Sequence, residues 1–172
     1  YNARPTHEYF ENQSGKLHSE RGMPAPLTYE GLLRTIPEDK MWPLFSTAMG
    51  QHDFTRHGAQ GGETFLSMME KAFGPVDNAR QFCDLAQWIS YDGYRAMFES
   101  TSKSRQGLLL WMSHSAWPSM VWQTYDYYFE PIGAFFGSRK GCEPLHIQYN
   151  PLTHATETVS YTHLTLPTNS LV

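Results

Sequence analysis

The sequence predicts an α/β fold with a parallel sheet, and three observations support this prediction. A strand-like stretch at residues 16–24 carries the carboxylate of Glu20 and ends in a proline-rich turn. Helical patterns fill residues 65–97, and a short apolar run follows at residues 108–112. Strands that alternate with helices in this order form parallel sheets, because a parallel connection needs a crossover to return to the starting edge.

The composition suits one domain and excludes two classes of partner. The chain has 172 residues, of which 40% are hydrophobic and 15% aromatic. Only 17% are charged and the net charge is −4, so we expect neither nucleic acid nor a membrane surface as a partner. The longest apolar run, residues 108–112, is far shorter than the roughly 20 residues of a membrane span. Many aromatic rings with little charge are typical of proteins that stack on sugars, and also of tyrosine-rich cores.

The first expected strand carries the strongest candidate for a reacting group. Its segment reads Lys16-Leu-His-Ser-Glu-Arg-Gly-Met-Pro24. Pro24 and Pro26 turn the backbone directly after Glu20. Enzymes with α/β folds mount reacting groups at such strand ends. A solvated loop glutamate is the alternative interpretation of this stretch taken alone.

Two short helices and a long loop are expected next. Thr28 has the properties of an N-cap, and the helix that it starts ends before Pro37. A second short helix is expected near residues 41–45. Residues 46–62 predict a long loop with four glycines and three polar candidates: His52, Asp53 and His57. Loops of this length are usually functional, although such side chains also satisfy loop backbone groups.

Two amphipathic helices and a buried strand follow. Apolar residues repeat with a helical period over residues 65–73, and Gly74-Pro75 ends this helix. A cap at residue 77 or 78 starts the longest helix, which reaches at least Met97. The continuous apolar run at residues 108–112 predicts a strand that is buried on both faces, as in a parallel sheet.

The pattern changes in the C-terminal part. Pro131 is expected to start another helix, which ends at Gly141. Residues 145–149 alternate between apolar and polar, as in a half-exposed antiparallel strand, and Asn150-Pro151 turns it. This change predicts a domain boundary near residue 143.

The chain is too short for the fold that its elements suggest. A complete (β/α)8 barrel takes about 250 residues, so we expect the last quarter of one. The chain starts at Tyr1 without a methionine or an apolar leader, and we interpret this start as a truncation. Residues 159–172 resemble translated sequencing-adapter read-through, and we expect this tail to be non-native.

The motifs together resemble a known enzyme family. The chain is similar to the C-terminal part of the catalytic barrel of glycoside hydrolase family 2, and most similar to its exo-β-glucosaminidase and β-mannosidase branch. The similarity covers about residues 16–150. It rests on these segments, in order: His18-Ser-Glu-Arg-Gly-Met-Pro24, His52-Asp-Phe54, Gly58-Ala-Gln60, Phe82-Cys83, Ala86-Gln87, Tyr94-Arg-Ala-Met-Phe-Glu99, Trp111 to Trp117-Pro118, Tyr125-Asp-Tyr-Tyr128, Gly133-Ala-Phe-Phe-Gly137 and Cys142-Glu-Pro-Leu-His146.

The resemblance implies a fold and an activity. The fold is an incomplete (β/α)8 TIM barrel at residues 1–142, followed by the start of an immunoglobulin-like β-sandwich at residues 143–158 and by the tail at residues 159–172. The activity is that of a retaining exo-β-glycosidase, which hydrolyses terminal β-linked glucosaminides or mannosides without a cofactor. The expected partner is a carbohydrate substrate. Members of this branch are commonly exported, so export is implied as well.

The resemblance also assigns the catalytic groups. A Ser-Glu-x-Gly segment after the seventh strand carries the family's nucleophile, which corresponds to Glu20. Its carboxylate has to be ionised to bond to the anomeric carbon. The acid/base residue of the family lies in an Asn-Glu pair after the fourth strand. No Asn-Glu pair occurs in the 172 residues, so this chain alone is predicted to be inactive.

Candidate substrate contacts follow from the same resemblance. Trp111 corresponds to a tryptophan that forms the floor of the sugar site by ring stacking; a core tryptophan is the alternative. His18 is a candidate for a hydrogen bond to the substrate or to Glu20. Trp117 is a further candidate, with core packing as the alternative, and His52 and Asp53 are candidates because they lie on the long loop. The β-mannosidases often have Asn-Asp where this chain has His114-Ser115, which argues against a mannoside substrate.

Two other classes are alternatives. A non-catalytic carbohydrate-binding module would use exposed tryptophans, but it should consist mostly of alternating strands with tight turns. A metal hydrolase would use His52, Asp53 and His57, but the two histidines lie five residues apart on a glycine-rich segment. Cys83 and Cys142 form neither a disulfide framework nor a metal-binding spacing, and we expect no metal.

Overall fold

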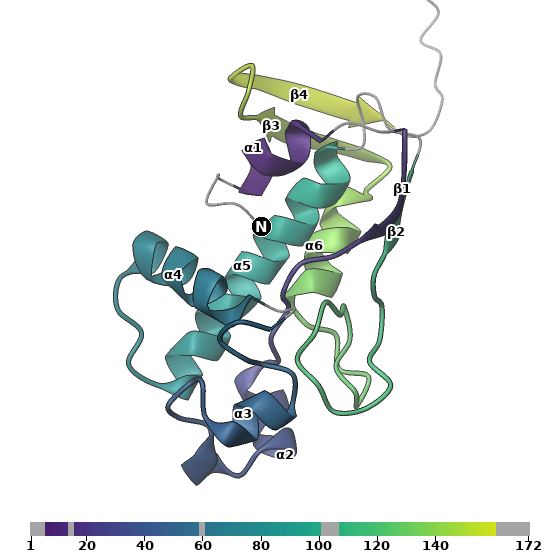
Figure 1. Ribbon diagram of the computed structural model, residues 1–172. Helices are drawn as coiled ribbons and strands as arrows, with labels where there is room; N and C mark the ends of the chain where they lie inside the picture. Colours follow the sequence, from purple (N-terminus) through teal and green to yellow (C-terminus); the bar gives the residue numbers. More distant parts are fainter. Residues whose placement is uncertain (1–5, 14–15, 59–60, 101–106, 161–172) are drawn as a thin grey trace, which may run out of the picture.

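The computed structural model describes residues 6–13, 16–58, 61–100 and 107–160, and arranges them around one long helix, α5 (Ala79–Glu99; Figure 1). The other helices are α1 (Thr6–Glu11), α2 (Tyr29–Thr35), α3 (Thr47–Gln51), α4 (Gly62–Phe73) and α6 (Gly133–Gly141), with a 3-10 turn, η1, at Glu38–Lys40. The strands are β1 (Leu17–Arg21), β2 (Gly107–Leu110), β3 (Leu145–Asn150) and β4 (Ala155–Ser160).

The predicted caps and breaks determine the helix boundaries. The side chain of Thr28 accepts a hydrogen bond from the N–H of Gly31 at 3.0 Å, and that of Asn78 accepts one from Gln81 at 2.9 Å. Gly74 ends α4 with a φ of 89°, where a side chain would be strained. The predicted helices at α2, α4 and α5 are therefore confirmed, and so is the helix at α6.

Two short elements differ from the prediction. The helix expected near residues 41–45 is instead the 3-10 turn at Glu38–Lys40, because Pro43 lacks the N–H that a helix there needs. The loop expected at residues 46–62 contains α3, because the Ser46 side chain accepts a hydrogen bond from the N–H of Met49 at 3.3 Å and caps a helical turn.

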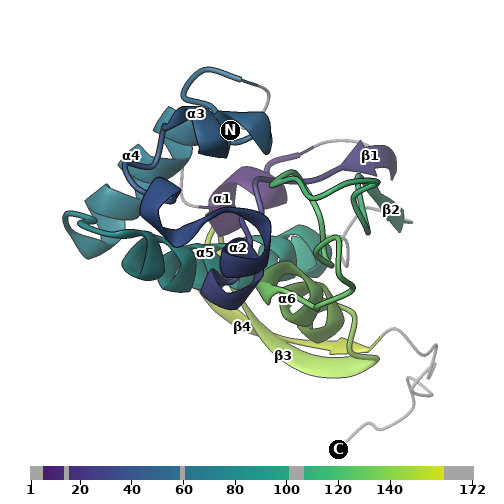
Figure 2. The ribbon, with the colours of Figure 1, turned by 90° about the horizontal axis from the view of Figure 1, so that it is seen from below.

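Helices α5 and α6 lie side by side with their backbones in contact (Figures 1 and 2). Glycines recur every fourth residue along α6, at positions 133, 137 and 141. A Cβ atom on Gly137 would overlap the backbone carbonyl of Tyr91 on α5. This glycine stripe permits an approach that larger residues would block.

Strands β1 and β2 form a two-stranded parallel sheet, which confirms the predicted pairing. The register consists of three pairs: Leu17 with Gly107, His18 with Leu108, and Arg21 with Leu110. The expectation that β2 is buried on both faces is wrong, since Leu109 is 59% exposed. Within the described residues, helices cover one face of this sheet and leave the other open.

Two hydrophobic clusters join the helices to each other and to the sheet. The first lies among α2, α3, α4 and α5, and its buried rings are Phe54, Phe65 and Phe82. The second lies among α1, α5, α6 and the covered face of the sheet. At its centre Tyr94 donates a hydrogen bond from its buried hydroxyl to the carbonyl of Met23 at 3.1 Å. Each fully buried large side chain contributes about 1.5–3 kcal/mol, so the second cluster anchors the sheet firmly.

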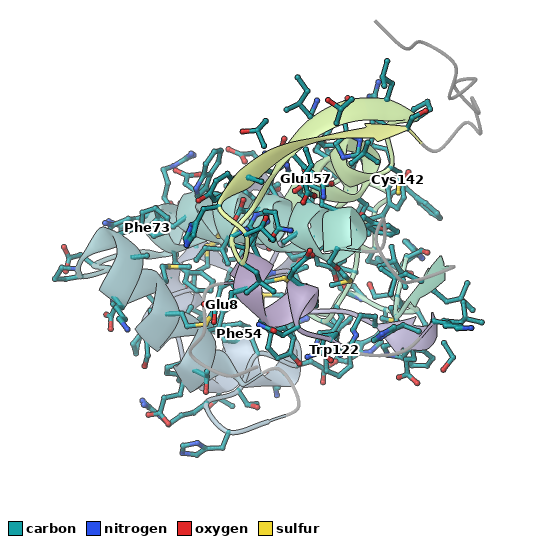
Figure 3. The ribbon with its side chains drawn as sticks, turned by 90° about the horizontal axis from the view of Figure 1, so that it is seen from above. Glu8, Phe54, Phe73, Trp122, Cys142 and Glu157 are labelled. Atoms are coloured by element: carbon teal, nitrogen blue, oxygen red, sulfur yellow. The ribbon has the colours of Figure 1, made fainter. Side chains whose placement is uncertain are left out.

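Strands β3 and β4 form an antiparallel hairpin that crosses the end of α5 (Figure 3). The predicted alternation is confirmed, and the apolar side faces outward: Leu145, Ile147 and Tyr149 are 68%, 65% and 54% exposed. The polar residues between them are buried: His146, Gln148 and Asn150. Val159 and Ser160, assigned to the expected tail, belong to β4, whereas residues 161–172 lie outside the described residues.

Candidate active site

The C-terminal ends of β1 and β2 bring Glu20 and Trp111 together. Glu20 is the penultimate residue of β1, and Trp111 directly follows β2. The N–H of Trp111 donates a hydrogen bond to the carbonyl of Arg21 at 2.8 Å. A Cβ atom on Gly22 would overlap the carbonyl oxygen of Trp111. The turn after Glu20 therefore packs directly on the Trp111 backbone, and a cis peptide bond joins Trp111 to Met112.

Strand β1 contains a register shift at Glu20. His18 and Arg21 are three residues apart, whereas their partners in β2 are only two apart. Ser19 and Glu20 therefore both oppose Leu109, which is the geometry of a β-bulge. Both are exposed. Bulges redirect side chains and are over-represented next to active sites.

His18 lies on the helix side of the sheet. Its partner in β2, Leu108, packs against the cluster around Tyr94. The Arg21 guanidinium donates to Nδ1 of His18 from Nε at 3.1 Å and from Nη2 at 2.8 Å, and to Oε1 of Gln13 at 2.8 Å. Because a guanidinium can only donate, Nδ1 of His18 is the acceptor and carries no proton.

The opposite face of the sheet is open. Three apolar side chains on it are strongly exposed: Leu17 at 62%, Leu109 at 59% and Trp111 at 50%. Glu20 is exposed on the bulge beside them. A carboxylate next to an exposed indole suits a sugar-binding site, because the pyranose ring of a sugar can stack on the indole while the carboxylate faces a carbon of that pyranose.

A buried carboxylate fixes the loop after β2 to α2. Asp126 is fully buried and accepts hydrogen bonds from the N–H groups of Tyr128 at 2.8 Å and Glu130 at 2.9 Å. Arg34 of α2 reaches Asp126 at 3.4 Å and lies over the ring of Tyr128. Asp126 is not among the functional residues predicted from the sequence. An aspartate two residues before a turn is the available signal, since it can bond its own backbone.

His52 and Trp117 form a second group, built from the segment after α3 and the loop after β2. Nδ1 of His52 lies 2.6 Å from the carbonyl oxygen of Pro118, and the rings of His52 and Trp117 stack with centroids 6.0 Å apart. The N–H of Met120 donates to the carbonyl of His52 at 2.9 Å. Asp53 follows with a φ of 66°, in the left-handed region. The structure thus brings two predicted substrate contacts together.

A further aromatic pair lies on the surface of the loop after β2. His114 stacks on Phe129 with centroids 4.3 Å apart, and Phe129 is 73% exposed. The sequence could not reveal this pair, because only the folded loop brings the two residues together. His57 lies elsewhere, paired with Glu63 at 3.3 Å.

Other site types find little support in the described residues. No group of three or more His, Cys, Asp or Glu among them is arranged to hold a metal ion, and no helix among them is long and apolar enough to cross a membrane.

Burial raises the pKa of Cys83 to about 12, so its thiol stays protonated. A cavity of about 220 Å³ borders Arg21, Gly22 and Trp122. Ala59 and Gln60, from one of the family-like segments, lie outside the described residues.

Curated proteins are similar in sequence to this chain, although no protein-family model matches it. An exo-β-D-glucosaminidase of Amycolatopsis orientalis is 35% identical over 135 residues, which are 74% of this chain and 13% of that protein. A mannosylglycoprotein endo-β-mannosidase of Lilium longiflorum is 35% identical over 95 residues, which are 53% of this chain and 10% of that protein. The chain therefore spans about an eighth or less of the length of these relatives.

Solved structures share the fold. The crystal structure of the exo-chitosanase CsxA of Amycolatopsis orientalis matches with a TM-score of 0.73 and 28% identity, over 93% of this chain and 21% of that chain. A β-D-mannosidase from Dictyoglomus thermophilum matches with a TM-score of 0.76 over 88% of this chain and 19% of that chain. Its 20% identity shows similarity of fold alone.

Proposed function

We propose that this chain, which belongs to a family like glycoside hydrolase family 2, is the C-terminal part of the catalytic barrel of a retaining exo-β-glycosidase. The substrate is a terminal β-linked sugar of the glucosaminide or mannoside type. The observation that carries the proposal is the meeting of Glu20 and Trp111 at the shared end of two parallel strands. The longer polypeptide that this function requires is called the parent chain below.

Glu20 acts as the nucleophile in this proposal. Its ionised carboxylate bonds to the anomeric carbon while the glycosidic bond breaks and the leaving oxygen takes a proton from the acid/base group. Water then displaces Glu20 and restores the original anomeric configuration. Trp111 forms the floor of the site, because the apolar face of a pyranose packs well on an indole. His18 supports β1 from the helix side of the sheet, and further contacts to the sugar come from His52, Asp53 and Trp117.

The acid/base group belongs to the upstream part of the parent chain. A retaining enzyme needs a second carboxyl about 5–5.5 Å from the nucleophile. The 172 residues contain no Asn-Glu pair of the kind that carries it in the family. This chain alone is therefore expected to be inactive, because nothing protonates the leaving oxygen.

The open face of the sheet supports the placement of residues 1–142 at the end of a (β/α)8 barrel. With β1 and β2 as the seventh and eighth strands, the face that exposes Leu17 and Leu109 becomes the barrel interior, which apolar side chains fill. Residues 143–158 start an immunoglobulin-like β-sandwich, and the outward apolar side of β3 faces its core. The tail at residues 159–172 is non-native in this proposal, even though its first two residues extend β4.

The nucleophile assignment is tested by Glu20→Gln in the parent chain. The amide keeps the size of the side chain but cannot bond to the anomeric carbon. We expect turnover of p-nitrophenyl β-D-glucosaminide to fall by about six orders of magnitude, the size of loss that removal of a catalytic nucleophile produces. The melting temperature should stay within a few degrees, because Glu20 is exposed.

Glu30→Gln is the matched control, since the Glu30 side chain is 68% exposed and pairs only weakly with Arg80 at 3.4 Å. Its turnover should equal that of the unchanged parent chain. Full activity of Glu20→Gln would reject Glu20 as the nucleophile.

A carbohydrate-binding role without chemistry is the second candidate. The half-exposed indoles of Trp111 and Trp117 favour it, at 50% and 45% exposure. The same experiment separates the two candidates. If the parent chain is a binding module, it binds the sugar but shows no turnover even before any substitution. If it is an enzyme, it shows turnover, and Glu20→Gln removes that turnover.

A further inference from the structure

The bulge in β1 places Glu20 opposite Leu109, which is 59% exposed on the open side of the sheet. Side chains alternate between the two faces of a regular strand, so His18 and Glu20 would share the helix side. The register shift between His18 and Arg21 changes this, since Ser19 and Glu20 together oppose Leu109. A strand that relaxed to regular pairing would turn Glu20 toward the helices. The direction of the carboxylate therefore depends on the bulge.

One side chain bridges the bulge on the helix side. The Arg21 guanidinium reaches back to Nδ1 of His18, at 2.8 and 3.1 Å, and so connects the residue before the bulge to the residue after it. It also donates to Oε1 of Gln13, in the segment between α1 and β1, at 2.8 Å. The Arg21 carbonyl meanwhile accepts the hydrogen bond from the Trp111 N–H. Arg21 therefore joins both ends of the bulge to the end of β2.

The chemistry of arginine suits this position. Its guanidinium is planar, permanently charged and carries five donors in a fixed arrangement, so it holds two acceptors in one geometry. The contacts to His18 and Gln13 are partly buried, which limits competition from water. A lysine ammonium at the same place would be a flexible point charge and would hold the two acceptors less rigidly.

We propose that Arg21 is a positioning residue that directs Glu20 toward the sugar by locking the bulge in β1. This inference rests on the proposed function and deepens it. Arg21 lies on the opposite face from Glu20 and does not contact the sugar. It acts on the step in which Glu20 bonds to the anomeric carbon, while stacking of the sugar on Trp111 is unaffected. Loss of Arg21 therefore lowers kcat and leaves KM nearly unchanged.

The test uses three variants of the parent chain with p-nitrophenyl β-D-glucosaminide as the probe. Arg21→Met removes the donors and keeps most of the side-chain volume. We expect its kcat to fall about a hundredfold, the size of loss that a misplacement of about 1 Å produces, with KM within about twofold. Arg21→Lys should be intermediate. Arg80→Met is the matched control, because Arg80 is exposed and bonds Glu30 at 3.4 Å, and it should behave like the unchanged protein.

Two results would overturn the inference. The first is a kcat of Arg21→Met within about twofold of the unchanged protein. The second is a loss of kcat with an equal rise of KM and a melting temperature many degrees lower, which would indicate a structural role. If Arg21→Met does not fold, Arg21→Lys decides the question, since a kcat equal to that of the unchanged protein would show that the guanidinium is not needed.

Glu20→Gln separates this inference from the proposed function. An inactive Glu20→Gln beside a fully active Arg21→Met would reject the role of Arg21 and keep the glycosidase. A fully active Glu20→Gln would reject the glycosidase mechanism itself.

Discussion

Gly22 sets the distance between the turn after β1 and the tryptophan after β2. A Cβ atom at this position would overlap the Trp111 carbonyl oxygen and lie 2.8 Å from Cβ of Trp122. The backbone at Gly22 is not left-handed, so the requirement for glycine is one of space. Glycine in the Ser-Glu-Arg-Gly segment thereby allows Glu20 and Trp111 to be neighbours.

Trp111→Ala should weaken sugar binding more than Trp42→Ala in the parent chain. The two indoles are 50% and 37% exposed, so both truncations remove a half-buried ring. Loss of stacking is worth about 0.5–1.5 kcal/mol, which predicts a rise in KM of about two- to thirteenfold for Trp111→Ala. Trp42→Ala should change KM less than about twofold. Equal effects in steady-state kinetics would contradict a stacking role for Trp111.

The proximity of Glu20 and Trp111 could be predicted from the sequence, because parallel strands end at the same edge of a sheet. The sides on which His18 and Glu20 lie relative to each other could not. They depend on the extra residue in β1, and no sequence pattern marks that residue. Arg21 was missed for the same reason, since a regular strand would place it on the opposite face from His18.

Helices α4 and α5 were predictable because their apolar residues keep a helical period and their ends carry clear caps. Helix α3 was missed because five residues are too few to show a period; the Ser46 cap was the signal available. The burial of β2 was predicted wrongly. A continuous apolar run indicates a strand that is buried in the complete protein, and it says nothing about which neighbours are present.

Asp126→Ala should destabilise the loop after β2 more than Arg34→Met. The aspartate satisfies two backbone N–H groups and one guanidinium, whereas Arg34 makes one half-exposed contact to it. We expect a loss of about 2–3 kcal/mol for Asp126→Ala and about 1 kcal/mol or less for Arg34→Met, because bonds to a buried charge exceed surface pairs. Urea unfolding of the parent chain measures both. Equal losses would show that the backbone bonds to Asp126 contribute little.

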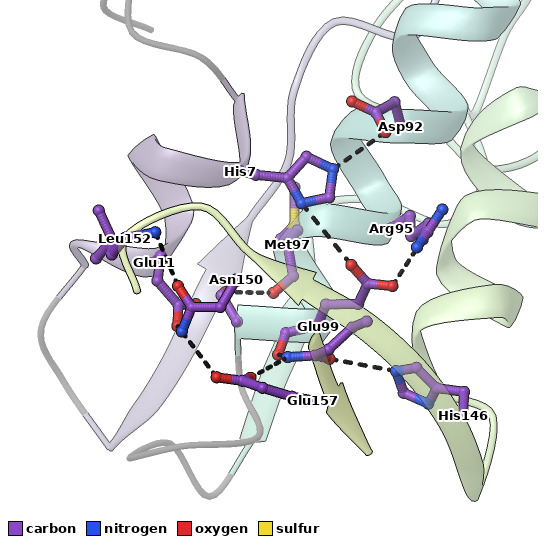
Figure 4. A network of polar contacts seen from close by, with 12 residues as sticks. His7, Glu11, Asp92, Arg95, Met97, Glu99, His146, Asn150, Leu152 and Glu157 are labelled. Atoms are coloured by element: carbon purple, nitrogen blue, oxygen red, sulfur yellow. Dashed lines mark hydrogen bonds and ion pairs between the residues drawn. The ribbon is translucent and has the colours of Figure 1, made fainter. Parts of the chain in front are cut away.

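A polar network joins α1, α5 and the hairpin at the end of the molecule opposite α2 and α3 (Figures 1 and 4). Glu99, 3% exposed, accepts a hydrogen bond from Arg95 at 2.6 Å and faces His7 at 3.7 Å. The amide of Gln148 in β3 donates to the Glu99 carbonyl at 3.4 Å. The buried polar side of the hairpin therefore fastens it to α5, and its apolar side remains outward.

The same network predicts a dependence of stability on pH. Burial acts to raise the pKa of Asp92, but the hydrogen bond from His7 and the charges of His7 and Arg95 hold it below its usual value of 3.8. A carboxyl with a lowered pKa stabilises the folded state above the pKa of the unfolded chain, and this contribution is lost as the pH falls through the lowered value. Asp92 should therefore stabilise the fold fully above about pH 4 and lose this contribution progressively as the pH falls further.

Asp92→Asn provides the measurement. At pH 5 to 6 the variant should be less stable than the unchanged parent chain by less than about 1 kcal/mol in urea unfolding, because the Asp92 side chain is 43% exposed. The difference should shrink as the pH falls below 3.8 and through the lowered pKa of Asp92. A difference that keeps its size throughout the acid titration would contradict the assignment.

The architecture of the whole molecule was predictable only in part. The order of a parallel pair followed by an antiparallel hairpin is visible in the change from a continuous to an alternating apolar pattern. The outward direction of Leu145, Ile147 and Tyr149 is not visible there, because alternation fixes two faces without saying which one is covered. The polar contacts around Glu99 decide that question, and they connect residues far apart in the sequence.

The extra residue in β1 also has a genetic consequence. In the proposed enzyme, an in-frame loss of the codon for Ser19 would leave every remaining codon unchanged, yet it would remove the bulge: Glu20 alone would oppose Leu109, and β1 would lose the bend that the extra residue gives it. Substitution of Ser19 would have no such effect, since only the count of residues matters there. Among homologous genes, the interval between His18 and Arg21 should therefore resist insertions and deletions more strictly than it resists changes of amino acid.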